Sequence, residues 1–174
     1  MASKTATPPA AAGRFTLPLA YTAFFLTIEP ISTLVGAYFA YFQPLYYLKL
    51  THAASAPINA SSIPPSTSIV MQQLAKLYLL LSINEALILR TTYDLKVWKV
   101  FLLGLLIADV GHIWTVREAM GWAGYWQVWT WNAIDWGNLG FVYLAATMRI
   151  CFLAGVGMKP GATPTATKAT SKTS

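Results

Sequence analysis

The sequence has little charge of either sign and a single cysteine. Charged residues make up 10% of its 174 residues and hydrophobic residues 56%, whereas soluble domains contain about 25% charged residues. A water-soluble fold of this length would lack the polar side chains that it needs to cover its surface. Cys151 lies in an apolar run, which excludes a disulfide framework and a thiol metal site. The composition therefore indicates a protein that folds in lipid.

Basic residues outnumber acidic ones, 12 to 6, for a formal net charge of +6. A basic stripe between stacking aromatic side chains is typical of a nucleic-acid-binding surface. The basic residues of this sequence form no such stripe. Many of them lie in short flanks and tails beside apolar stretches, where Lys and Arg set the orientation of a membrane protein. We therefore predict no nucleic-acid partner.

Four apolar stretches lie between polar ends, and each is close in length to the roughly 20 residues that cross a bilayer core. They predict an all-α polytopic membrane protein, a four-transmembrane-helix bundle at residues 16–156. The flanking segments 1–15 and 157–174 are rich in Ala, Ser, Thr and Pro and are predicted to be disordered. The predicted spans are residues 17–42, 68–89, 97–116 and 135–155.

Three connections join these spans. Residues 43–67 contain several prolines and a Ser-rich run, which predicts an exposed loop without a helix. The short connection 90–96 predicts that the second and third helices are antiparallel neighbours. Residues 117–134 are dense in tryptophan, which favours a segment lying at headgroup level. The alternative for this last segment is an aromatic lid over a ligand site.

The distribution of Lys and Arg in the short flanks predicts that both termini are cytoplasmic. An even number of spans returns the carboxyl end to the side of the amino end. Asn59 opens an Asn-Ala-Ser acceptor pattern for N-glycosylation, and this orientation places it on the outer or lumenal side. The outer side then keeps only Lys49 and Arg117, and the inner side collects Lys4, Arg14, Arg90, Lys96, Lys99, Lys159, Lys168 and Lys172.

Ionisable residues inside the predicted spans are candidate functional residues, because each costs about 2.5 to 3.5 kcal/mol on insertion scales. A rise of 1.5 Å per residue from the inner end of each span puts Glu29, Lys76 and Asp109 at one depth, roughly 18 to 20 Å. The same count puts Glu85 and Arg149 in a lower layer, at roughly 6 to 9 Å. A third layer, at roughly 22 to 26 Å, contains Gln72, Gln73, His112 and Asn138.

Glu29 precedes Pro30, whose missing N–H leaves the carbonyl of Leu26 without its helical donor and can kink the helix. The freed carbonyl and the carboxyl group would form a polar notch, in which Glu29 is a candidate proton donor. The alternative is a kinked helix in which Glu29 only hydrogen-bonds a neighbouring helix.

Asp109 and His112 are spaced i, i+3 and therefore share one face of the third helix. They can bond each other or share a ligand, and a carboxylate that orients an imidazole suits proton transfer. The equally weighted alternative is that both simply tie helices together. One buried histidine without a cysteine partner disfavours a metal. The sequence has no Gly-rich phosphate loop or other cofactor motif, so we predict neither a metal nor a cofactor.

Glu85 is level with Arg149, which predicts a buried ion pair between the second and fourth helices. Lys76 shares a polar stripe of the second helix with Gln72 and Gln73. We expect Lys76 to pair with Glu29 or Asp109, or to hold an anionic head group.

The segment Ile28-Glu29-Pro30-Ile31-Ser32, continued by Gly36-Ala37-Tyr38, Gln43-Pro44 and Tyr47, resembles the opening of a family of small fungal four-helix membrane proteins. That family is similar to the EXPERA group, which contains sterol isomerases and sigma-2-like sterol binders. It more distantly resembles the transmembrane terpene cyclases. The resemblance covers most of the chain and implies an endoplasmic reticulum protein with an intramembrane pocket for a sterol or isoprenoid.

The resemblance also implies roles for the buried residues. Glu29 or Asp109 would donate a proton to an alkene or epoxide, with His112 as relay. The protein would then be an isomerase or cyclase with membrane lipid and a lipophilic small molecule as its partners. The alternative is a non-catalytic lipid-binding or assembly protein of the same membrane, and a homodimer is left open. A proton pathway ranks third. The predicted substrate-binding residues are Lys76, Gln73, Glu85 and Asn138, with the rings of Trp114 and Tyr143 facing a cation.

Overall fold

The computed structural model describes residues 17–158, which are helical with no strand among them. The tails predicted to be disordered lie outside the described residues, except for Gly157 and Met158. Two long helical segments come first. One consists of α1 (Leu19–Ala23), the π-helical turn η1 (Phe24–Ile28) and α2 (Glu29–Phe42). The other consists of α4 (Pro65–Ile83), the π-helical turn η4 (Asn84–Ile88) and α5 (Leu89–Thr91).

The second half of the described chain contains two further long helical segments. Helix α6 (Leu95–Gly124) is followed by a segment made of α7 (Ala133–Asp135), the π-helical turn η6 (Trp136–Gly140) and α8 (Phe141–Leu153). The remaining elements are α3 (Pro44–Thr51) and the short 3-10 turns Ala53–Ser55, Ala60–Ser62 and Val128–Thr130.

Three helices of the described chain are long and apolar enough to cross a membrane: Leu19–Phe42, Leu95–Gly124 and Ala133–Leu153. They correspond to three of the four predicted spans, so the predicted all-α membrane character is confirmed. The segment formed by α4, η4 and α5 is as long as these helices but is not among them. That it crosses the membrane stays a prediction.

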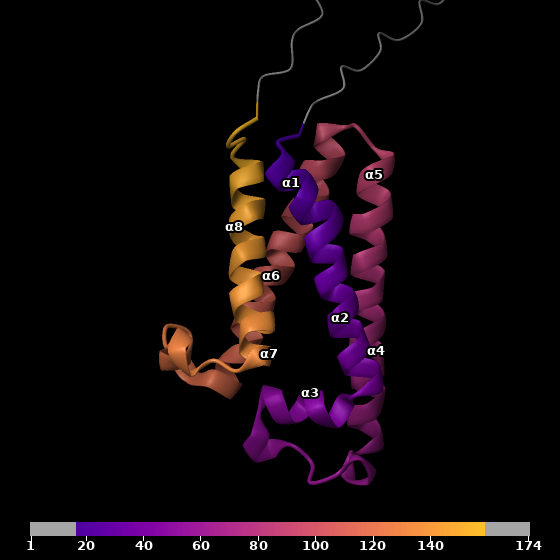
Figure 1. The fold of residues 1–174 in the computed structure, drawn as a ribbon, viewed down its shortest axis with the longest axis vertical. Coiled ribbons are helices and arrows are strands. Elements are labelled where there is room, and N and C mark those ends of the chain that lie inside the picture. The colour runs from indigo at the N-terminus through magenta and orange to yellow at the C-terminus, as the bar shows by residue number, and fades with distance from the viewer. Residues whose placement is uncertain (1–16, 159–174) are drawn as a thin grey trace, which may run out of the picture.

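The helices pack as two pairs, α2 with α4 and α6 with α8. Figure 1 shows that the pairs lie close together at the end where the described residues begin and finish, and diverge toward the other end. Helices α4 and α6 were expected to be packed neighbours because of the short connection 90–96, and only residues 92–94 separate α5 from α6. They run in opposite directions, but each packs mainly on another partner.

Helix α3 contradicts the expectation of a helix-free loop at residues 43–67. Pro44 occupies the first helical position, where its missing N–H leaves no hydrogen bond unmade. Helix α3 crosses the open end of the bundle and contacts α7 (Figure 1). The amide of Asn132 donates to the carbonyl of Leu50 at 3.0 Å and ties α3 to the start of α7.

The main hydrophobic core lies at the closed end. Its buried side chains include Phe25, Leu102 and Phe152, each with no exposed surface, packed around Trp98. The Tyr21 hydroxyl donates to the carbonyl of Val156 at 2.8 Å and fastens the first helical segment to the end of the last. The two helix pairs are therefore packed directly together at this end, whereas at the other end α3 and α7 join them.

Candidate functional site

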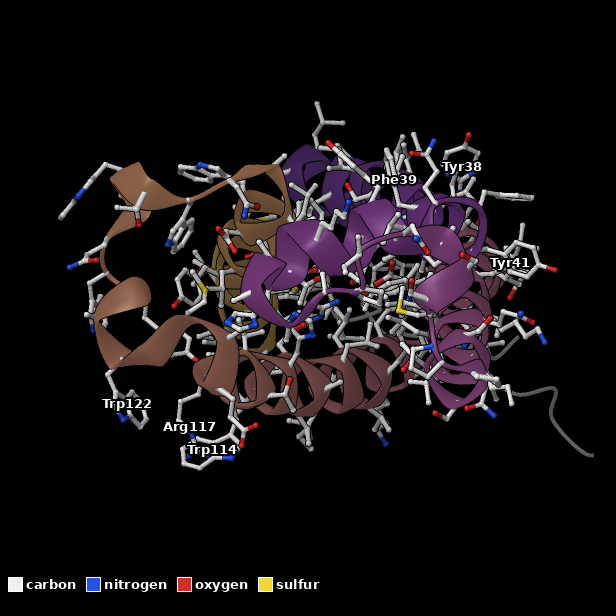
Figure 2. The ribbon with its side chains drawn as sticks, turned by 90° about the horizontal axis from the view of Figure 1, so that it is seen from below. Tyr38, Phe39, Tyr41, Trp114, Arg117 and Trp122 are labelled. Atoms are coloured by element: carbon white, nitrogen blue, oxygen red, sulfur yellow. The ribbon has the colours of Figure 1, made fainter. Side chains whose placement is uncertain are left out.

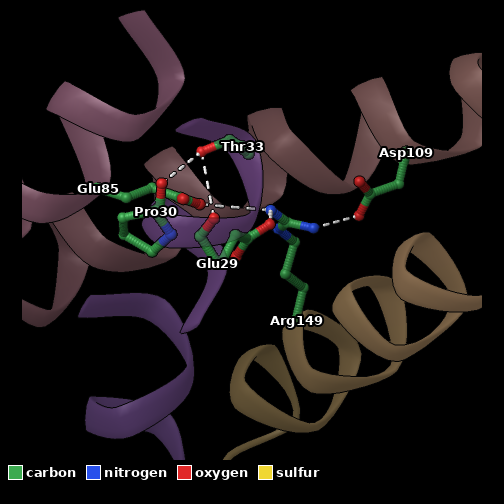
Figure 3. A network of polar contacts seen from close by, with 6 residues as sticks. All are labelled: Glu29, Pro30, Thr33, Glu85, Asp109 and Arg149. Atoms are coloured by element: carbon green, nitrogen blue, oxygen red, sulfur yellow. Dashed lines mark hydrogen bonds and ion pairs between the residues drawn. The ribbon is translucent and has the colours of Figure 1, made fainter. Parts of the chain in front are cut away.

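Arg149 of α8 is the centre of a buried charged cluster (Figure 3). Its side chain is 1% exposed and forms ion pairs with carboxylates from three other helical segments. Nη1 donates to Asp109 Oδ2 at 2.5 Å, and Nη2 donates to Glu29 Oε1. Nη2 also lies 3.5 Å from Glu85 Oε1. One guanidinium thus links α2, η4, α6 and α8.

The cluster contains more acid than base. Three carboxylates and one guanidinium would carry a formal charge of −2 if all were ionised. Buried charge is tolerated when it is neutralised by a partner, so the cluster is balanced only when protons or a bound cation supply the difference. Glu29 Oε2 and Glu85 Oε2 are buried and have no hydrogen-bond partner in the described chain. The cluster therefore has more negative than positive formal charge beside two carboxyl oxygens that no group of the described chain binds.

Three π-helical turns position the polar residues of the site. Turn η1 ends immediately before Glu29, η4 contains Glu85, and η6 contains Asn138. Such turns are rare and often occur at functional sites, since the extra residue changes which side chains point inward. Each of these three segments therefore departs from regular helix next to a polar group.

The backbone around Pro30 behaves as the sequence predicts. The Leu26 carbonyl, which lacks the donor that an i+4 residue normally supplies, accepts from Arg90 Nη2 at 2.5 Å. The Pro30 carbonyl accepts from Ser82 Oγ at 2.8 Å and from Thr33 Oγ1 at 3.0 Å. The Ser82 bond fixes α2 against α4 beside the carboxyl group of Glu29.

A cavity of about 720 Å³ lies between the two helix pairs. Cavities of roughly 300 to 1,000 Å³ accommodate small organic ligands. Most of the wall is apolar, with contributions from α2, α3, α4, α6, α8 and η6. The charged residues on the wall are Glu29, Asp109 and Arg149. Glu85 is fully buried and does not line the cavity, which contradicts its predicted contact with a substrate.

His112 also lines the cavity, as does Asn138. The Nε2 atom of His112 is buried and has no hydrogen-bond partner in the described chain. Asp109 and His112 do not bond each other, because Asp109 binds Arg149. Both residues line one cavity, and that they share a ligand there stays a prediction.

The predicted ion pair of Glu85 with Arg149 is confirmed at 3.5 Å. Their assignment to a separate lower layer is wrong, because Arg149 also binds Glu29 and Asp109. Counting residues along a helix places the Cα atom, whereas a long arginine side chain carries its charge several ångströms away. Glu29 and Asp109 of one predicted layer therefore join Glu85 and Arg149 of the other in one cluster.

The predicted substrate contacts of Lys76 and Gln73 and the predicted pairing of Lys76 with a carboxylate are wrong, whereas a contact of Lys76 with an anionic head group stays a prediction. Both side chains are exposed and neither lines the cavity, and Gln72 beside them is also exposed. Helix α4 instead buries Met71, Ala75 and Ser82. Lys76 therefore points away from Glu29 and Asp109, whose positive partner is Arg149.

The predicted cation-facing rings also lie elsewhere. Trp114 is 58% exposed and stacks with Arg117, whose Cζ is 4.3 Å from the ring centroid. Figure 2 shows both on the outer side of α6, pointing away from the bundle. Tyr143 packs against the cluster of Tyr125 and Trp131. The rings that line the cavity, which sequence reasoning missed, are Phe39, Tyr46, Tyr47, Tyr78, Trp136 and Phe141.

The exposed tryptophans of the connection do not line the cavity, to which the connection contributes only Ala133 and Ile134 at its end. Trp122, Trp126 and Trp129 are 65 to 78% exposed, and none of them lines the cavity. Gly121 breaks α6 with a φ of 63°, a conformation that favours glycine, and turns the chain outward. The exposed rings contradict the lid alternative and fit the predicted segment at headgroup level.

Fold and site define an all-helical integral membrane protein with a charged cluster at the wall of an internal cavity. The family model for a domain of unknown function, DUF7704, matches residues 14–159. The chain therefore belongs to this family. No curated protein and no solved structure matches it.

Proposed function

We propose that the protein binds a sterol or isoprenoid in its cavity and isomerises or cyclises it by proton transfer. The observation that carries this proposal is the juxtaposition of a largely apolar wall with the buried cluster of Glu29, Asp109 and Arg149. An apolar wall suits a lipophilic body, and a small number of charged groups then acts on a defined position of it.

The chemistry needs one proton donor and one acceptor. Glu29 or Asp109, when protonated, adds its proton to an alkene carbon and leaves a carbocation on the neighbouring carbon. Loss of a proton from an adjacent carbon to the free Nε2 of His112 forms the double bond at a new position. The rings of Trp136 and Phe141 on the cavity wall can stabilise the intermediate cation.

A microsomal assay with sterol and prenylated substrates tests this proposal. His112→Gln and at least one of Glu29→Gln and Asp109→Asn should lower turnover by about 10²- to 10⁴-fold, the usual contribution of a general acid or base. Glu118→Gln is the matched control, because this carboxylate is exposed and remote from the cavity. Unchanged turnover in both Glu29→Gln and Asp109→Asn would contradict the proposal.

A non-catalytic binding protein is the second candidate. It is favoured by the contacts of Arg149, which already occupies one oxygen of Glu29 and one of Asp109. The carboxylates would then hold the arginine, and the cavity would only store or present its ligand. Mass spectrometry of lipid that copurifies with the protein distinguishes the two, since a binder releases its ligand unaltered.

The proposal includes four membrane spans in the endoplasmic reticulum with both termini cytoplasmic. Its support is the packing of α4 along α2 and the position of the first and last described residues at one end of the bundle (Figure 1). Asn59, which is exposed, would then be lumenal. Glycosylation that Asn59→Gln abolishes, with terminal tags open to protease in intact microsomes, is the expected result. Tags on opposite sides would contradict it.

A further inference from the structure

Two tyrosine hydroxyls meet at the cavity wall away from the charged cluster. Tyr47 of α3 is buried, and its hydroxyl oxygen lies 3.2 Å from that of Tyr78 of α4. Both residues line the cavity. They also line a smaller adjoining cavity of about 300 Å³, so the pair stands at the boundary between the two spaces.

The tyrosine pair is well separated from the arginine cluster. A Cβ atom on Gly36 would lie 3.3 Å from Cδ2 of Tyr78, which places the ring beside this point of α2. Gly36 follows Glu29 by seven residues in the same helix, a rise of about 10 Å. The cavity thus has a charged zone around Arg149 and a neutral polar zone at the tyrosines.

The tyrosine pair has one hydrogen-bond donor that no group of the described chain uses. A phenol has one O–H donor and can also accept. One of the two hydroxyls donates to the other, and the second O–H has no partner elsewhere in the described chain. A neutral donor of this kind suits a hydroxyl or carbonyl oxygen.

We infer that the Tyr47–Tyr78 pair binds a hydroxyl or carbonyl oxygen of an elongated lipophile whose opposite part lies at Arg149. The inference rests on the proposed function, which supplies the lipophilic ligand. It adds the chemical class of that ligand: a lipophile with one terminal oxygen, remote from the position that the carboxyl groups reach. Tyr47 and Tyr78 are then specificity-determining residues. An analogue without the oxygen leaves the free O–H without a partner and binds less tightly.

Paired probes test this inference on the purified full-length protein in detergent micelles. Tritiated ergosterol is compared with its 3-deoxy counterpart, and geranylgeraniol with the corresponding hydrocarbon. The parent should prefer the hydroxylated member of at least one pair by about five- to tenfold, as expected for one hydrogen bond. The double variant Tyr47→Phe/Tyr78→Phe should lose this preference and still bind the deoxy member like the parent. Tyr41→Phe, outside the cavity wall, should retain the preference.

The outcomes separate this inference from the proposed function. If the parent binds both members of each pair equally, or the double variant keeps the full preference, the role of the tyrosines is wrong and a lipophile-binding cavity still stands. A double variant that weakens both members equally shows only that the pair ties α3 to α4, which also overturns the inference. If no probe binds the parent, the proposed function fails and the inference fails with it.

Discussion

The two ends of the bundle use the same helices for different purposes. At the closed end Phe25, Leu102 and Phe152 have no exposed surface and fill the space between the helix pairs. At the other end the pairs enclose a cavity of about 720 Å³, and α3 lies across the opening. Stability is thereby concentrated at one end, which leaves the other end free to bind a ligand.

Along one face of α6 the side chains pass from the hydrophobic core to the cavity wall. Leu102 is in the core, Leu105 packs on its edge and lines the cavity, and Asp109 and His112 follow on the cavity wall. These residues are three or four apart, so they form one row along the helix. The Arg149 cluster lies where the packed and open ends meet, and it joins both helix pairs.

Removing Arg149 should have the largest effect on the whole molecule. Arg149→Met leaves three carboxyl groups without their cation, and breaking a buried ion pair costs about 3 to 5 kcal/mol. The free energy of unfolding, measured by denaturant titration in mixed micelles, should fall by this amount. Arg117→Met, at a partly exposed site, is the matched control.

Neutralising the acids should restore part of this loss. Adding Glu29→Gln and Asp109→Asn to Arg149→Met removes two of the three uncompensated carboxyl groups, leaving Glu85, and should recover part of the stability. A triple variant no more stable than Arg149→Met would show that the arginine acts through packing, not through charge.

Leu102→Ala and Leu105→Ala compare the two ends within one helix. Core Leu→Ala substitutions cost about 2 to 5 kcal/mol, because they leave a void, and Leu102 is fully buried. Leu105→Ala only enlarges an existing cavity and should cost less than half as much. Unfolding in micelles measures both. Equal losses would contradict the division into a packed and an open end.

The long apolar helices and a buried ion pair could be predicted from the sequence. Three of the predicted spans reappear as long apolar helices, because a run of about 20 apolar residues has few alternatives to crossing a bilayer. The pair of Glu85 with Arg149 was also predictable, since a charge in such a run needs a partner. Pro30 freed the Leu26 carbonyl as expected, and Arg90 binds it.

The rotation of each helix about its axis and the reach of the long side chains could not be predicted from the sequence. Lys76 was expected inside, but apolar residues occur on every side of α4, so its sequence does not reveal which side packs against α2. Arg149 was placed too low, because counting residues ignores the length of its side chain. Pro44 was taken to prevent a helix, although it begins α3. The tyrosine pair depends on α3 and was missed for that reason.

Substitution of Arg90 tests a contact near the closed end, and its expected effect on the free energy of unfolding is smaller. Arg90→Met removes the donor to the Leu26 carbonyl and should cost about 1 to 2 kcal/mol, since the donor is charged. Pro30→Ala restores a backbone N–H at this position of α2, so in that background the cost of Arg90→Met should shrink. A double-mutant cycle on the unfolding free energy measures the difference. Equal costs in both backgrounds would show that the proline does not create the need for Arg90.

The smallest effect is expected where α3 crosses the open end. Asn132 caps α7 and also donates to the Leu50 carbonyl at 3.0 Å. Asn132→Ser keeps a capping oxygen but is too short to reach Leu50, so it should cost about 0.5 to 1.5 kcal/mol. Asn132→Ala loses the cap as well, worth roughly 0.5 to 2 kcal/mol more.

Hydrogen exchange separates these two contributions. With Asn132→Ser the amides of α3 should exchange faster, while those of Leu102 and its neighbours in the core stay protected, because only the contact across the open end is lost. With Asn132→Ala the first amides of α7 should also exchange faster. Unchanged exchange in α3 would mean that the Tyr47–Tyr78 bond and the apolar contacts of α3 hold it in place without Asn132. Faster exchange throughout the core would contradict the independence of the two ends.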